Sequence, residues 1–92
     1  AGCQALWFEV EKPEEAHSPA ERLLVERRIA FYQRQGARLL RGIHYLQVIG
    51  AHQPPTPMHL MVHPLQALEP EQALAQASQV FHLTRRGALA LE

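Results

Sequence analysis

The stretch RRIAFYQRQGARLLR (27–41) contains the side chain best suited to chemistry, the phenol of Tyr32. Tyr32 follows Phe31 near the end of a predicted helix, and Gly36 follows four residues later. A phenol with a pKa of about 10 stays protonated at neutral pH and can donate its proton to a developing base. A tyrosine can equally be a half-buried core residue whose hydroxyl reaches water. The residue type alone leaves both interpretations open.

Six histidines form a second group of potentially reactive side chains. His59 and His63 lie four residues apart on a predicted strand and therefore on one face, with His44 on the neighbouring strand and His52 in the loop. Three converging imidazoles can bind zinc, but no cysteine or carboxylate lies near them to complete a ligand set. We therefore interpret them as surface or cleft histidines and expect no metal site.

Cys3 is the lone cysteine, and it lies near the start of the chain with no predicted base beside it, so a cysteine nucleophile is not expected. A single cysteine excludes an internal disulfide and favours a reducing, cytoplasmic compartment. Nine basic and nine acidic residues give zero net charge, so nothing indicates nucleic acid binding. The sequence has neither a signal peptide nor an apolar run of about 18 residues, so we expect no membrane association.

The elements that position Tyr32 begin with ALWFEVE (5–11), which is rich in aromatic and branched residues and predicts a strand. Alternation divides its side chains between two faces, with Leu6, Phe8 and Val10 on one and Trp7 and Glu9 on the other. Because both faces are apolar up to Glu9, the pattern favours an internal strand over an edge strand.

A helix is predicted over 19–35. Ser18 is the expected N-cap, Pro19 lies in the first turn, and Glu21 is placed to complete a capping box, while Gly36 provides the stop. The helical period gathers five residues on one apolar face: Leu24, Val25, Ile29, Phe31 and Tyr32. Arg28 falls inside that face, where we expect it to extend to solvent or to pair with Glu21.

Two further strands, 38–49 and 58–63, flank the proline-rich loop 51–57 and are expected to form an antiparallel hairpin. Gly42 within the first of them indicates a bulge or bend. Glu69-Pro70-Glu71 then opens a last helix, about 70–83, with Leu74, Ala77, Val80 and Phe81 on one side. The expected organisation is a half-domain over 1–68, a C-terminal helix over 69–90, and a possible cloning remnant at 91–92.

These residues together resemble the second half of the GCN5-related N-acetyltransferases, the GNAT fold. That family has a strand L-x-L-E-V, a loop, and a helix ending A-x-x-x-Y-x-x-x-G-F. The strand LWFEV (6–10) and the helix end RIAFYQRQGA (28–37) follow this order, and the hairpin resembles the family's last two strands. The resemblance covers roughly residues 4–63. It implies an α/β (α+β) fold in which this chain is the C-terminal half.

The resemblance also implies functional residues. The family's helix tyrosine often protonates the thiolate of coenzyme A, and Tyr32 stands at that position as general acid. Glu9 is a secondary catalytic candidate, and the general base is not assigned. The remaining implied positions contact acetyl-CoA, namely Phe8, Val10, Arg28 and Phe31, or line the substrate cleft, namely Trp7. The implied reaction is acetyl transfer from acetyl-CoA to an amine on a small molecule or a protein.

Departures from the family pattern limit this expectation. The pyrophosphate-binding motif Q/R-x-x-G-x-G/A is not found in these 92 residues. Val25, Arg28 and Ala37 replace an asparagine, a small residue and an aromatic residue. We therefore expect a half-fold that is inactive alone and is completed by N-terminal elements or by a homodimer through the first strand. The alternative is a non-catalytic interaction or dimerisation module derived from the same fold.

Overall fold

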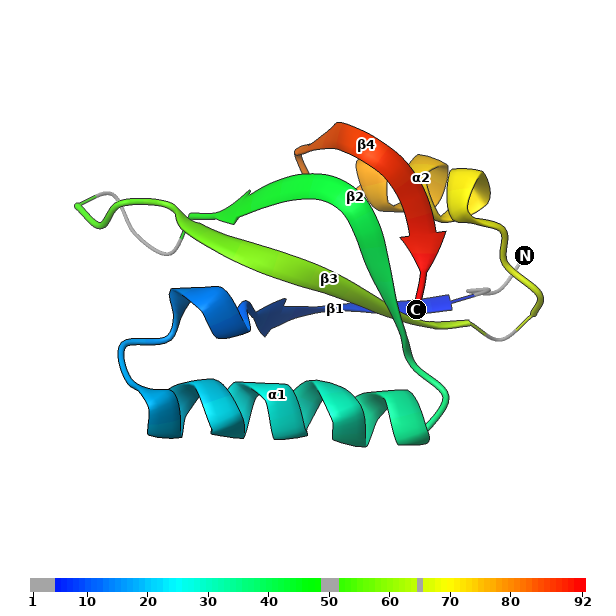
Figure 1. Cartoon of the computed structure of the whole chain (residues 1–92). Helices are drawn as coiled ribbons and strands as arrows, with labels where there is room; N and C mark the ends of the chain where they lie inside the picture. The colour runs from blue at the N-terminus through cyan, green and yellow to red at the C-terminus, as the bar shows by residue number, and fades with distance from the viewer. Residues whose placement is uncertain (1–4, 49–51, 65) are drawn as a thin grey trace.

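Four antiparallel strands form one sheet that carries a helix on each face (Figure 1). The computed structural model describes residues 5–48, 52–64 and 66–92. The elements are β1 (Ala5–Glu11), the short 3-10 helix η1 (Pro13–Glu15), α1 (Pro19–Arg34), β2 (Arg38–Gln47), β3 (Thr56–Pro64), α2 (Pro70–Ser78) and β4 (Leu83–Leu91). The spatial order β1-β3-β2-β4 places β1 and β4 at the two edges. The predicted α+β class is confirmed, and the described residues form four strands where three were predicted.

The ends of α1 follow from local signals. The Ser18 hydroxyl accepts a hydrogen bond from the Glu21 N–H at 3.1 Å, as expected for an N-cap. The Glu21 carboxylate accepts instead from the His17 N–H at 3.0 Å, so the predicted capping box does not close on Ser18. The helix ends at Arg34, and Gly36 has the left-handed φ of +98° that stops it.

One stripe of α1 packs on the sheet, and it is narrower than predicted. Val25 and Ile29 are buried against Val10, Leu39 and Met61, and Phe8 and Tyr32 pack at the side of this cluster. Leu24 and Phe31, expected on the same apolar face, are 59% and 50% exposed and lie outside the packed stripe. The reason is geometric: positions 25, 29 and 32 point at the sheet, while positions 24, 28 and 31 form the neighbouring stripe.

The opposite face of the sheet is covered by α2. Its Ala73 and Ala77 are fully buried against Leu40, Leu60 and Val62, because small side chains let the helix approach the strands closely. The predicted start of α2 is confirmed by Pro70 in the first turn and a Glu69–Gln72 capping box.

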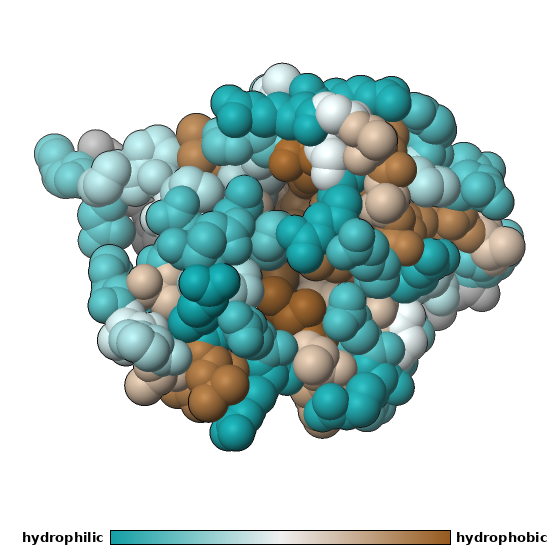
Figure 2. All heavy atoms as spheres, in the orientation of Figure 1, coloured by the Kyte–Doolittle hydropathy of each residue, from teal (hydrophilic) through white to brown (hydrophobic). Residues whose placement is uncertain are grey.

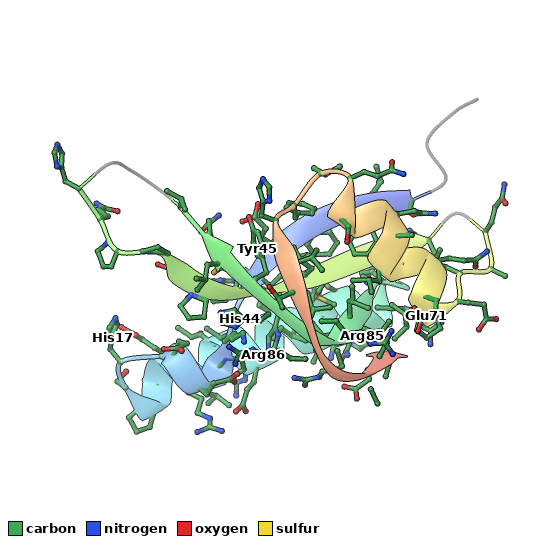
Figure 3. All side chains as sticks on the ribbon, turned by 90° about the horizontal axis from the view of Figure 1, so that it is seen from above. His17, His44, Tyr45, Glu71, Arg85 and Arg86 are labelled. Carbon is green, nitrogen blue, oxygen red and sulfur yellow. The ribbon has the colours of Figure 1, made fainter. Side chains whose placement is uncertain are left out.

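The C-terminal helix predicted over 69–90 is wrong beyond Ser78, where α2 ends. Val80, expected on one side of that helix with Leu74, Ala77 and Phe81, lies beyond α2 and is 73% exposed, and β4 follows from Leu83. The strand forms because the free edge of β2 accepts it along Leu40–Tyr45, a long-range pairing that outweighs local helix propensity. Arg85 then joins β4 to α2 through an ion pair with Glu71 at 2.9 Å (Figure 3).

The last two residues of the sequence pack and pair with the folded domain. Leu91 is 8% exposed in the α2-side core. Leu39 and Glu92 exchange two backbone hydrogen bonds of 2.6 and 2.9 Å.

The β2–β3 hairpin is confirmed, with a register shift between Leu40 and Tyr45 and a left-handed φ of +89° at Gly42, where the bulge was expected. Strand β2 ends at Gln47, and position 49 lies outside the described residues. Strand β3 begins at Thr56, earlier than predicted, and contains Pro57. Because β1 ends opposite Met58, Pro57 is paired on one side only, where proline is tolerated.

Candidate functional site

A shallow cleft of about 430 Å³ lies beside β1, between the sheet and the C-terminal end of α1. Its lining comes from three elements and the turn after α1: Leu6, Phe8, Glu9, Tyr32, Gln35, Ala37 and His63. We call it the Tyr32 cleft. It brings together Phe8, Glu9 and Tyr32, three of the residues that the sequence singled out.

Tyr32 occupies the last turn of α1 and leans on β1. Its ring packs edge-to-face on Phe8 with 5.0 Å between ring centroids, and on Phe31 with 5.8 Å. The capped start and the Gly36 stop fix the length of α1, and the stripe through 25, 29 and 32 fixes its rotation. The phenol is therefore held half-buried beside an edge strand.

Glu9 lines the same cleft, but its carboxylate is engaged elsewhere. The Tyr45 hydroxyl and the Gln47 amide both donate to Glu9 Oε2, at 3.2 and 2.6 Å. Tyr45 packs with the cluster on the α2 side and meets Phe81 edge-to-face at 5.3 Å. The Glu9 carboxylate therefore bridges β1 to β2 across β3, away from Tyr32. Burial, and secondly the Glu9 charge and hydrogen bond, raise the pKa of Tyr45 above 10.0.

Replacing Glu9 with glutamine should lower the pKa of Tyr45 toward its ordinary value, because the negative charge that opposes phenolate formation disappears. The glutamine oxygen can still accept both hydrogen bonds, so the fold is retained. The measurement is a phenolate absorbance titration in a Tyr32→Phe background, which leaves Tyr45 as the single tyrosine. A matched Glu11→Gln variant, changed at an exposed position on the same strand, should leave the titration unchanged. An unshifted Glu9→Gln curve would contradict the bridge.

The other predicted site residues do not line the Tyr32 cleft. Trp7 packs on the α2 side of the sheet, and Val10 is 4% exposed in the α1-side core. Arg28 pairs with Glu11 at 3.2 Å on the surface, in place of the expected Glu21. Phe31 is half exposed beside Tyr32. Of the residues that the resemblance implies for acetyl-CoA contact, Phe8 lines the Tyr32 cleft. Trp7, the implied substrate residue, does not line it.

His63 belongs to the Tyr32 cleft and was not predicted as a site residue. It lies opposite Leu6 in the β1–β3 pairing, and its Nε2 is 3.0 Å from the Gln35 carbonyl oxygen. That contact favours an Nε2–H tautomer and leaves Nδ1 as an acceptor. The four-residue spacing correctly predicted that His59 and His63 lie on the same face of β3. The position of His63 beside Tyr32 follows from the pairing of β3 with β1.

The outer edge of β1 adjoins exposed apolar side chains. Among the described residues β1 pairs with β3 only, so β1 is an edge strand there and not the predicted internal strand. Leu6, Leu24 and Phe31 are 58%, 59% and 50% exposed. An unpaired strand edge flanked by apolar groups is a typical site for strand addition. We call the edge and these three residues the β1-edge surface.

Over the described ranges 5–48, 52–64 and 66–92, no group of three or more histidine, cysteine or acidic side chains is arranged to hold a metal ion. In the same ranges neither helix is long and apolar enough to cross a membrane. Comparison of the chain with protein-family models, with curated proteins and with solved structures gave no match.

Proposed function

We propose that this chain is the C-terminal half of a GNAT-type acyltransferase domain, which transfers an acetyl group from acetyl-CoA to an amine. One observation carries the proposal: Tyr32 stands in the last turn of α1 against Phe8 of β1, beside an open sheet edge. The strand, helix and hairpin occur in the order that the resemblance implies. A cytoplasmic location, suggested by the single cysteine, is part of this proposal.

In the proposed reaction the neutral amine nitrogen attacks the thioester carbonyl, the tetrahedral intermediate loses one N–H proton to water, and its carbon–sulfur bond breaks. Tyr32 supplies the proton that the departing thiolate takes up. A hydroxyl positioned beside the sulfur acts here as a general acid. Phe8 and Phe31 hold the ring in place.

The β1-edge surface is where we place the missing half of the site. A further strand added along β1 would cover Leu6 and bring a second wall to the Tyr32 cleft. That strand comes from N-terminal elements of the same domain or from a second copy. Without a phosphate-binding turn in these 92 residues, the chain alone should not hold acetyl-CoA tightly.

The test begins with calorimetric titration of acetyl-CoA into the chain, which should give no saturable heat. A polypeptide extended upstream to a Q/R-x-x-G-x-G turn, roughly 30–40 residues before Leu6 by the family spacing, should bind it. In that longer protein Tyr32→Phe should lower kcat about a hundredfold with little change in KM for acetyl-CoA. Tyr45→Phe is the matched control, because it removes a phenol on the other face. Tight binding by the chain alone, or full activity of Tyr32→Phe, would contradict the proposal.

The second candidate is a non-catalytic interaction module, and the exposed apolar β1-edge surface favours it. Val25 is buried and Arg28 is used in a surface ion pair, so neither needs a cofactor to explain it. This candidate predicts that strand addition persists in Tyr32→Phe while no acetyl transfer is detected in any form. A stable monomer in light scattering would exclude its two-copy version.

A further inference from the structure

A second cleft, of about 460 Å³, lies on the other flank of α1, toward β2 and Glu92. It is bordered by η1, α1, β2 and β3, and we call it the His59 cleft. Figure 2 shows apolar atoms recessed behind hydrophilic ones between α1 and the sheet. Clefts of several hundred Å³ with an apolar floor and a few polar groups are typical of small-molecule sites.

His59 is the buried polar group of this cleft. It lies on the central strand β3, and its side chain is 10% exposed. Its Nε2 is 4.0 Å from Glu14 Oε1, which is too long for a hydrogen bond, and no other group of the described residues bonds the ring. No fully buried side-chain nitrogen or oxygen of the described residues lacks a hydrogen-bond partner, so solvent in the cleft reaches the unbonded ring nitrogens of His59. A ring nitrogen that is reached from the cleft is therefore available to a bound molecule.

Two arginines on facing walls provide additional unused donors. Arg41 of β2 contacts Glu92 through Nε at 2.9 Å, and Arg22 of α1 contacts Glu26 through Nε at 3.1 Å. The terminal amino groups of both guanidinium groups bond no residue in the described ranges. These forks match the geometry of a carboxylate.

The cleft is lined by two arginines and three glutamates, and Glu26 and Glu92 are each paired with one of the arginines. Burial has the largest effect on the pKa of His59 and lowers it. The charges of Arg41 and Lys12 lower this pKa further, and the charges of Glu14 and Glu92 raise it by less. The neutral imidazole keeps an N–H to donate. Glu14 is the opposing group, because its carboxylate points toward the same nitrogen.

We propose that the His59 cleft binds a small organic carboxylate with a short apolar tail. The carboxylate is bound by Arg41 and Arg22 with a hydrogen bond to His59, and the tail lies on Ile29 and Leu39, which line the cleft with 8% and 1% exposure. This inference does not depend on the proposed acyl transfer, since the Tyr32 cleft lies on the opposite flank of α1.

The test is a titration of the full chain with sodium butyrate, followed by NMR of the backbone amides and the histidine rings. Saturable shifts at His59, Ile29 and Leu39 are expected, with a Kd of about 1 mM for so small a ligand. Acetate should bind more weakly because its tail is shorter. Arg41→Gln should weaken butyrate binding about tenfold, whereas Arg27→Gln, an exposed change of equal charge outside the cleft, should not.

Glu14→Gln gives the sharpest result, since removal of a competing carboxylate should strengthen butyrate binding about threefold. Glu14 is 56% exposed, so this variant is expected to fold. Tighter binding of butylamine than of butyrate, or weaker butyrate binding by Glu14→Gln, would overturn the anionic ligand. If inorganic phosphate bound as tightly as butyrate, the proposed contact of an apolar tail with the cleft would be wrong. The absence of saturable shifts in the folded protein would overturn the site.

Discussion

Gly42→Ala is expected to lower the free energy of unfolding by about 3–5 kcal/mol, a large part of the stability of a chain of this length. Gly42 has φ +89°, which a residue with a Cβ adopts only with strain. A Cβ placed there would lie 2.3 Å from the Ala88 carbonyl oxygen and 2.8 Å from its carbon. Both are backbone atoms, so β4 itself would have to move away from β2.

Gly87→Ala is the matched control for this substitution. Gly87 also has a left-handed φ, +108°, but an added Cβ there meets nothing within 4 Å. The strain alone should cost about 1–2 kcal/mol. Urea unfolding measures how much free energy of unfolding each variant loses. The difference between the two losses is the cost of the close approach of β2 and β4. Equal losses in the two variants would show that backbone strain, and not the contact with Ala88, explains the requirement for glycine.

A substitution at Gly42 also affects the His59 cleft, because Glu92, which follows the end of β4, lines that cleft. The register of β2 against β4 changes between Arg41 and Ile43, and beyond the change Leu40 pairs with Leu91. This pairing places Glu92 beside Leu39 and brings its side-chain carboxylate to Arg41 Nε. A displaced β4 would therefore release Arg41 from its ion pair. We expect Gly42→Ala to change the cleft as well as the stability.

Local signals made much of the fold predictable. Ser18-Pro19 and Glu69-Pro70 start helices where the structure has them, because capping depends on a few consecutive residues. Gly36 ends α1, and Gly42 marks the bulge, since both positions need a left-handed backbone. Alternation in 5–11 gave the two faces of β1 correctly, as the separate clusters around Phe8 and Trp7 show.

The strand β4 and the composition of the clefts depend on contacts between distant segments. Arg85-Arg86-Gly87 is consistent with a helix end, and only the free edge of β2 makes it part of a strand. Glu9 was placed on the correct face, but its bridge to Tyr45 and Gln47 requires β2 to lie two strands away. His63 lies beside Tyr32 because β3 pairs with β1. A single sequence does not contain these pairings.

Acid should destabilise this protein through His59 by about 3 kcal/mol between about pH 7 and about pH 4. Burial, then the charges of Arg41 and Lys12, lower the pKa of His59 from 6.5 to about 4, against the smaller opposite effects of Glu14 and Glu92. Arg22 and Glu26 of α1 line the same cleft and already pair with each other. Because the folded state disfavours the imidazolium, the stabilisation is complete above the unfolded pKa of about 6.5. It is lost as the pH falls through the folded pKa of about 4.

The measurement is urea unfolding at both pH values for the parent protein and for His59→Gln, which keeps a polar side chain that does not titrate. The variant should lose about 3 kcal/mol less than the parent between the two conditions, whatever its stability at pH 7. Carboxylates also titrate in this range, and their contribution is common to the parent and the variants. The control is His82→Gln, altered at an exposed histidine, which should lose as much free energy of unfolding as the parent between the two pH values. An identical pH dependence for the parent and His59→Gln would mean that the imidazole protonates freely in the folded state. The His59 cleft would then be open to water, and its ring would offer a ligand no more than a surface histidine does.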